Sequence, residues 1–145
     1  MKVSPQPQIS VHNRQRKIAL DRDALQRFAA GALPLCLRER GRGPGLTSIK
    51  EIYVLLVSDR RISELHRRFM GIEDPTDVIT FQHGEIFISV ETARSQAKAH
   101  RTSLAHELRL YLVHGLLHLH GFDDHAPDGR RRMDLVQEEI VAAAR

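Results

Sequence analysis

The sequence predicts a small mixed β-sheet of about four strands with helices packed on it. Short runs of β-branched and aromatic residues are interleaved with longer segments of helical periodicity, which is the pattern of layered helices and strands. The 145 residues have the usual size of one domain, and no linker divides them. A hydrophobic content of 41% suffices for one core. We therefore expect residues 1–145 to form a single domain.

The N-terminal part predicts one strand and one helix. Residues 8–11 alternate weakly between polar and apolar side chains, which indicates a first strand, and a basic bend follows. In residues 21–40 apolar side chains recur at intervals of three and four, which indicates a helix. Because proline lacks an N–H group, we expect Pro34 to interrupt this helix.

A glycine-rich breaker separates this helix from the next elements. The breaker is Gly41-Arg-Gly-Pro-Gly45, and residues 49–57 after it carry the composition of a strand. Ser58 or Asp59 can then cap a second helix, which we expect to end near Gly71.

Two extended runs follow, and their spacing predicts a hairpin. Residues 76–81 form the first run and residues 84–90 the second, with a short turn between them. Residues 91–99 then indicate a third helix.

The C-terminal part predicts the longest helix and a final one. Residues 103–120 carry an uninterrupted helical pattern, which Gly121 stops. Pro127 and Asp128 precede a last helix with four core-facing side chains, Met133, Val136, Ile140 and Val141.

The composition excludes several classes of protein. With 28% charged residues the chain has no apolar run long enough to span a membrane, and its first residues lack the apolar stretch of a secretory signal. We therefore expect a soluble, cytoplasmic protein. The single cysteine, Cys36, excludes an internal disulfide and a cysteine-rich zinc cluster, so a metal ion here would need histidine and carboxylate ligands.

The charge is compatible with a polyanionic partner but does not identify one. Lys and Arg number 22 against 18 Asp and Glu, which gives a net charge of +4. Arginine binds phosphate through a planar fork of donors. Aromatic residues make up only 5%, so no stacking platform for single-stranded nucleic acid is evident.

Two histidines stand four residues apart in the long helical segment, in His114-Gly-Leu-Leu-His118. On a helix they lie one turn apart and about 40° from one another, so both imidazoles can face one ion. Gly121 can end the helix and reverse the chain, which brings a third ligand back over the pair. Asp124 falls at the offset that zinc enzymes of this spacing use, and His125 is the alternative third ligand.

Three protein ligands leave a coordination position open, which is the arrangement of a catalytic zinc site. Gly115 occupies the place where helical zinc peptidases carry a glutamate base, which weakens a peptidase interpretation. His120 points away from the pair and is not included in the site. Glu107 and Asp123 are further carboxylates that could support the site or accept a proton.

Three ordered motifs resemble the YbeY family of bacterial endoribonucleases that mature ribosomal RNA. The main one is H-G-L-L-H-L-H-G-F-D-D-H at residues 114–125, which is similar to the family's H-G-x-L-H-L-x-G-Y-D-H. The others are residues 75–81, similar to its T-D-V-L-S-F strand, and residues 84–93, similar to its G-D-I-x-I-S segment. Met133 and Glu138 suit its final helix.

The resemblance implies an α+β fold and one zinc ion, with ligands at His114, His118 and the position of Asp124. The family most often has histidine at that third position. It also commonly has an arginine just before the glycine after the second helix, where this chain has Met70. Arg67 and Arg68 are close by but do not match by position.

The resemblance further implies cleavage of single-stranded RNA, maturation of the small-subunit rRNA 3′ end, and a part in ribosome quality control. The partners would then be ribosomal RNA and the small ribosomal subunit. Two alternatives share the site geometry: a metal-dependent hydrolase of peptides or other small esters and amides, and a non-enzymatic ribosome-associated factor with a structural zinc.

Overall fold

A four-stranded mixed sheet lies at the centre of the computed structural model, which describes residues 6–70 and 78–144. The strands lie in the order β1-β2-β4-β3. They are β1 (Gln8–Asn13), β2 (Glu51–Val57), β3 (Val78–Phe81) and β4 (Glu85–Ser89). β1, β2 and β4 run parallel, whereas β3 pairs with β4 in the opposite direction. The predicted α+β fold and the predicted hairpin are confirmed.

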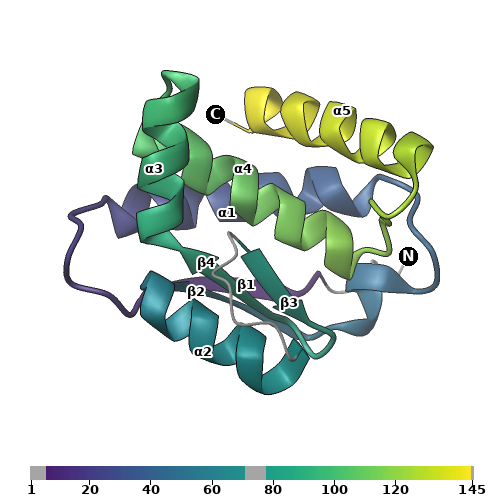
Figure 1. Cartoon of the computed structure of the whole chain (residues 1–145). Helices are drawn as coiled ribbons and strands as arrows, with labels where there is room; N and C mark the ends of the chain where they lie inside the picture. Colours follow the sequence, from purple (N-terminus) through teal and green to yellow (C-terminus); the bar gives the residue numbers. More distant parts are fainter. Residues whose placement is uncertain (1–5, 71–77, 145) are drawn as a thin grey trace.

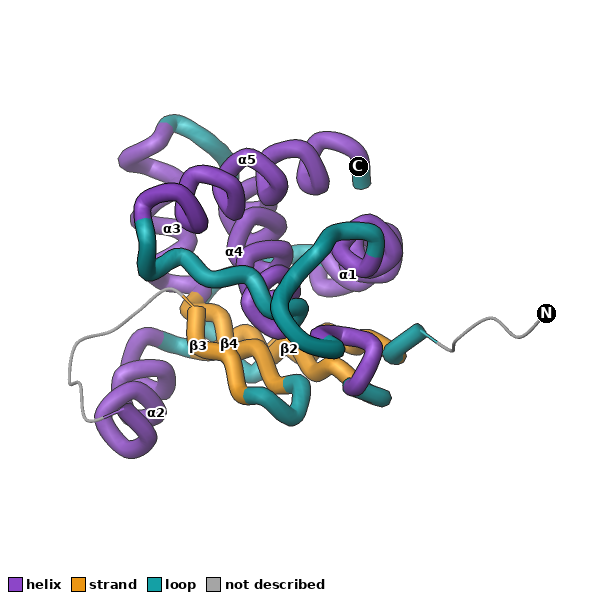
Figure 2. The backbone as a smooth tube through the Cα atoms, turned by 90° about the vertical axis from the view of Figure 1, so that its right-hand side faces the viewer, coloured by secondary structure: helices purple, strands orange, loops and turns teal. Residues whose placement is uncertain are grey.

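The helices lie on both faces of this sheet, and most lie on one face (Figure 1). That face carries α1 (Arg22–Leu37), α3 (Val90–His100), α4 (Leu104–Leu119) and α5 (Pro127–Ala143). Helix α2 (Asp59–Met70) covers part of the opposite face, as the end-on view in Figure 2 also shows. Because both faces are covered, β2 has core side chains on each: Ile52, Val54 and Leu56 on one, and Val57 on the other.

Helix α4 is the central element of the larger layer. It contacts α1, α3, α5 and the strands β3 and β4. Its buried residues surround most of its circumference, and they are Glu107, Leu108, Tyr111, Leu112, Val113, Gly115, Leu116, Leu117 and Leu119. A helix that is buried on nearly all sides is held rigidly, so side chains on its remaining exposed stripe have a fixed position.

The outer edge of β1 is covered by a side chain from α1. Gln26 Oε1 accepts a hydrogen bond from the Val11 N–H at 2.7 Å, and Gln26 Nε2 donates to the Ile9 carbonyl at 2.9 Å. This amide satisfies the backbone as a neighbouring strand would, and so protects a sheet edge that could otherwise pair with another chain.

One expectation about local structure needs correction, the interruption of the first helix at Pro34. Helix α1 continues through Pro34 and ends at Leu37, because a proline near the last turn removes only one internal hydrogen bond while Leu33 and Cys36 on either side are buried in the core. The glycine-rich breaker ends in a short 3₁₀ helix, Gly45–Ser48, that the composition did not indicate. The expected helix end at Gly71 and the first two residues of the expected strand 76–81 lie outside the described residues.

Two helical glycines should respond in opposite directions to alanine. A Cβ at Gly115 would lie 2.6 Å from Ile86 Cγ2 in β4, whereas a Cβ at Gly31 would lie 3.8 Å from its nearest neighbour, the Ala144 carbonyl oxygen. We expect Gly31→Ala to raise the free energy of unfolding by about 0.5–1 kcal/mol through helix propensity. Gly115→Ala should lower it by about 1 kcal/mol or more, because overpacking outweighs the same gain. Urea unfolding of both variants measures this, and a stabilised Gly115→Ala would contradict the packing described.

Candidate metal centre

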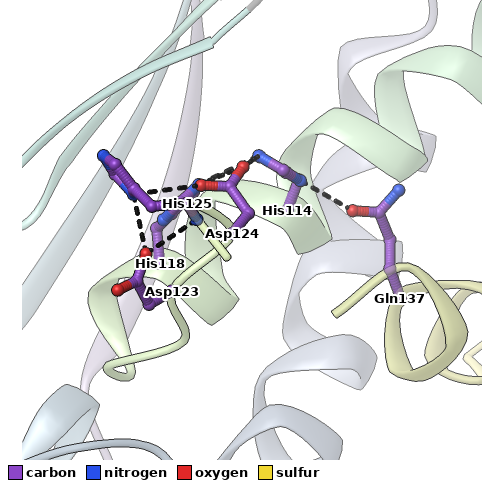
Figure 3. A network of polar contacts seen from close by, with 6 residues as sticks. All are labelled: His114, His118, Asp123, Asp124, His125 and Gln137. Carbon is purple, nitrogen blue, oxygen red and sulfur yellow. Dashed lines mark hydrogen bonds and ion pairs between the residues drawn. The ribbon is translucent and has the colours of Figure 1, made fainter. Parts of the chain in front are cut away.

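The end of α4 presents the two predicted histidines and then turns back over them. The helix ends at Leu119, and Gly121 follows with a φ of 96°, in the left-handed region that favours glycine. A Cβ at Gly121 would lie 2.2 Å from the carbonyl oxygen of Arg42, so the close approach of this loop also requires glycine. The reversed chain brings Asp124 to the same side as His114 and His118 (Figure 3).

The three side chains form a compact donor group. Nε2 of His114 and Nε2 of His118 are 3.0 Å apart. Asp124 Oδ2 lies 3.8 Å from the first of these nitrogens and 3.5 Å from the second. The three side chains are 27%, 26% and 32% exposed, so the group is open to solvent on one side.

The spacing of these donors fits a tetrahedral metal site. Ligands about 2.0–2.1 Å from a zinc ion and at tetrahedral angles are ~3.4 Å apart. The three observed separations of 3.0, 3.5 and 3.8 Å lie on both sides of that value. Two imidazoles and one carboxylate are also a donor set that zinc accepts. The residues present therefore fit a divalent metal ion.

Gln137 on α5 orients the first histidine, and sequence reasoning missed it. Its Oε1 lies 2.9 Å from His114 Nδ1 and can only accept, so that nitrogen carries the proton and Nε2 directs its lone pair into the site (Figure 3). The sequence does contain a pattern that marks Gln137. Gln137 lies among Met133, Val136, Ile140 and Val141, so it is a polar residue within the apolar stripe of its helix.

The electrostatics of the site favour the form of histidine that binds metals. Burial lowers the pKa of His118 below its ordinary value, and the neighbouring His114 lowers it further, while Asp124 acts in the opposite direction. A neutral imidazole is the form that binds a metal, so the lowered pKa of His118 would extend metal binding to lower pH.

His125 lies apart from the two histidines. Its side chain is 88% exposed, and its Nδ1 lies 2.7 Å from Asp123 Oδ1 and 3.7 Å from Asp124 Oδ1. The structure thus brings Asp124 into the donor group with the histidine pair and places His125 beside the two aspartates instead. Hydrogen bonds from the backbone and ring of His125 lower the pKa of Asp123, which makes that carboxylate a weak base.

The remaining candidates have structural roles. His120 is 7% exposed; its Nδ1 accepts from the Leu46 N–H at 3.2 Å and its Nε2 lies 2.7 Å from the Glu39 carbonyl oxygen. Glu107, 2% exposed, accepts from Thr102 at the first turn of α4, far along the helix from the histidine pair. His120 therefore ties the breaker loop to the end of α4, and Glu107 ties down its start.

The residue after His114 is Gly115, so the chain lacks the glutamate base that a helical zinc peptidase carries at this position. Gly115 is buried against Ile86, and even a Cβ would come within 2.6 Å of that side chain. A glutamate at this position would point into the sheet and not toward the donor group.

Comparison with known proteins agrees on one family. A family model described as endoribonuclease YbeY matches residues 10–145. A Moorella thermoacetica protein named endoribonuclease YbeY is 32% identical, over 92% of this chain and 94% of the relative. A Thermus thermophilus protein of the same name is 36% identical over 77% of this chain and 85% of its own. One from Anaeromyxobacter is 40% identical, but the match covers only 54% of its length.

The fold also has a counterpart among solved structures. The solution structure of a Thermotoga maritima protein superimposes with a TM-score of 0.65 over 94% of this chain and 88% of that one, at 25% identity. The β-sheet and helix arrangement described above is therefore shared with an experimentally determined structure.

The orienting contact of Gln137 predicts a measurable loss of metal affinity. Gln137→Leu removes the acceptor for His114 Nδ1, and we expect zinc to bind about 10-fold to 100-fold more weakly. Gln137→Glu keeps an acceptor and should bind zinc at least as tightly as the parent chain. Competition with a chromogenic chelator measures both, with the exposed Asp134→Asn on the same helix as control. Equal affinity of Gln137→Leu and the parent chain would show that this contact does not orient the ligand.

Proposed function

Because the chain belongs to the YbeY family of endoribonucleases, we propose that it cleaves single-stranded RNA with the help of one zinc ion held by His114, His118 and Asp124. The observation that carries this proposal is the convergence of two Nε2 atoms and one carboxylate oxygen on a single, partly exposed point. Three protein donors with solvent access are the arrangement of a catalytic ion and leave room for a substrate oxygen.

The chain's own residues would divide the work as follows. His114, His118 and Asp124 would hold the ion, and Gln137 would keep His114 in the ligand tautomer. When bound, the ion would supply Lewis acidity, which polarises a phosphate oxygen and lowers the pKa of water. Two neutral imidazoles and one carboxylate leave the loaded site with a net positive charge, which favours an anionic phosphodiester.

Two observations favour this proposal over the alternatives. A hydrolase of peptides would need a base that the buried Gly115 does not supply. A purely structural zinc would normally have four protein ligands and a closed site, whereas the three donor side chains here are 26–32% exposed.

The proposal extends to the cellular role. We propose that the substrate is the 3′ end of the small-subunit rRNA, that the chain acts on the small ribosomal subunit and in ribosome quality control, and that it works in the cytoplasm as one domain. The family match over residues 10–145 supports the single domain, and the excess of arginine and lysine supports an RNA substrate. Within residues 6–70 and 78–144, none of the helices has the length and apolar character needed to span a bilayer.

Loss of one histidine ligand should separate folding from cleavage. We expect His114→Ala to remain folded, to bind less than one zinc per chain, and to cleave a single-stranded oligoribonucleotide at least 100-fold more slowly. The measurements are metal content by mass spectrometry, thermal melting, and cleavage by gel electrophoresis. If the loss of activity merely followed a loss of folded protein, the structural-zinc alternative would hold.

The two candidates for the third ligand make opposite predictions. Asp124→Asn removes the charge at 3.5 Å from His118 Nε2 and should weaken zinc binding and cleavage together. His125→Ala, at the neighbouring exposed position, should leave zinc affinity within about threefold of the parent chain. Chelator competition on both variants decides between them, and a reversed order would identify His125 as the ligand.

A further inference from the structure

Three glycine contacts join separate segments beside the metal centre. A Cβ at Gly41 would lie 1.7 Å from the His120 carbonyl oxygen, and a Cβ at Gly121 would lie 2.2 Å from the Arg42 carbonyl oxygen. On α5, a Cβ at Gly129 would lie 2.3 Å from the Asp123 carbonyl oxygen. Three segments therefore meet with their backbones in contact. They are the breaker loop, the loop that carries Asp124, and the first turn of α5.

Arginines flank these contact points. Arg40 and Arg42 stand on either side of Gly41, and Arg130, Arg131 and Arg132 follow Gly129 directly. The two groups meet, because Arg132 donates to the Arg40 carbonyl oxygen at 2.7 Å and stacks over Phe122 with 4.3 Å to the ring centroid. We call Arg40, Arg42, Arg130 and Arg132 the arginine rim.

Three guanidinium groups of the rim, those of Arg40, Arg42 and Arg130, are exposed to solvent. Among the described residues, neither the Arg42 nor the Arg130 side chain has a hydrogen-bond or ion-pair partner. Of the acidic groups nearby, Asp128 forms its ion pair with Arg131 and Asp123 forms its closest one with His125. The positive charge of Arg42 helps to lower the pKa of Asp123, so the two side chains lie near one another.

Arg130 lies on the same face of α5 as Gln137, the residue that contacts His114. Arg130 lies seven residues before Gln137, about 20° away around the helix and ~10 Å along it. Gln137 contacts His114, so this face of α5 is the one that lies against the donor group.

From this placement we infer that the arginine rim binds backbone phosphates of the RNA next to the bond that is cut. The inference rests on the proposed function, since it assigns the substrate's path at the same site. Arginine suits this role because its planar fork can hold a phosphate by two hydrogen bonds. An RNA strand bound to the rim would follow the junction between the breaker loop and α5, on the side of the molecule away from α2 (Figures 1 and 2).

Binding to metal-free protein tests the rim separately from cleavage. A fluorescent single-stranded oligoribonucleotide is titrated with the chelator-treated chain, with the Arg42→Gln/Arg130→Gln pair, and with the control pair Arg60→Gln/Arg61→Gln. Both variants lose two positive charges, and the control charges lie on α2 across the sheet. We expect the Kd of the rim pair to rise at least tenfold and that of the control pair by less than threefold. The slope of log K against log salt should become shallower by about 1.4 for the rim pair only.

A charge-conserving pair, Arg42→Lys/Arg130→Lys, should keep most of the affinity, and thermal melting checks that every variant is folded. Any one of three results would overturn the inference. The rim pair and the control pair could lose RNA affinity equally, the Kd of the rim pair could stay within threefold of the parent chain, or the parent chain could fail to bind the RNA. Failure of the proposed function has a different readout: a chain that binds the RNA through the rim but does not cut it when zinc is added.

Discussion

The reversal of the chain at Gly121 is the constraint on which the site depends. A helix alone can align two histidines, but a third donor must come from outside it, and here Asp124 reaches the pair because the backbone turns sharply with a φ of 96°. The same glycine allows the backbone of Arg42 to approach closely. A side chain at this position would therefore disturb both the Asp124 loop and the loop that packs against it.

The second requirement is a rigid base for the histidine pair. Helix α4 is buried on most sides, its start is held by Glu107 and Thr102, and its end is held by His120, which bridges to the breaker loop. Gly115 lets the helix lie directly on β4. These contacts fix the histidines before any ligand binds, which is the preorganisation that a metal centre needs. The same close packing removes the position from which a helical peptidase would draw its base, so one feature both supports the site and restricts its chemistry.

Local patterns in the sequence predicted what depends on local geometry. The histidine spacing, the glycine after it and the offset of Asp124 are all set within one helix and one turn, and the structure brings those three side chains together. Hydrophobic periodicity likewise indicated the helices and the hairpin. What could not be predicted depends on contacts between distant segments. Gln137 reaches His114 only because α5 packs on α4, and Gly129 meets Asp123 for the same reason. The continuation of α1 through Pro34 was missed because its buried neighbours outweigh a rule based on the residue alone.

The most direct test of the proposed ligand set is anomalous diffraction at the zinc edge from crystals of the zinc-loaded chain. That ligand set predicts a single peak about 2.0–2.2 Å from Nε2 of His114, Nε2 of His118 and a carboxylate oxygen of Asp124, with the fourth position not filled by the protein. A peak held by four protein ligands, or one centred on Asp123 and His125, would contradict it.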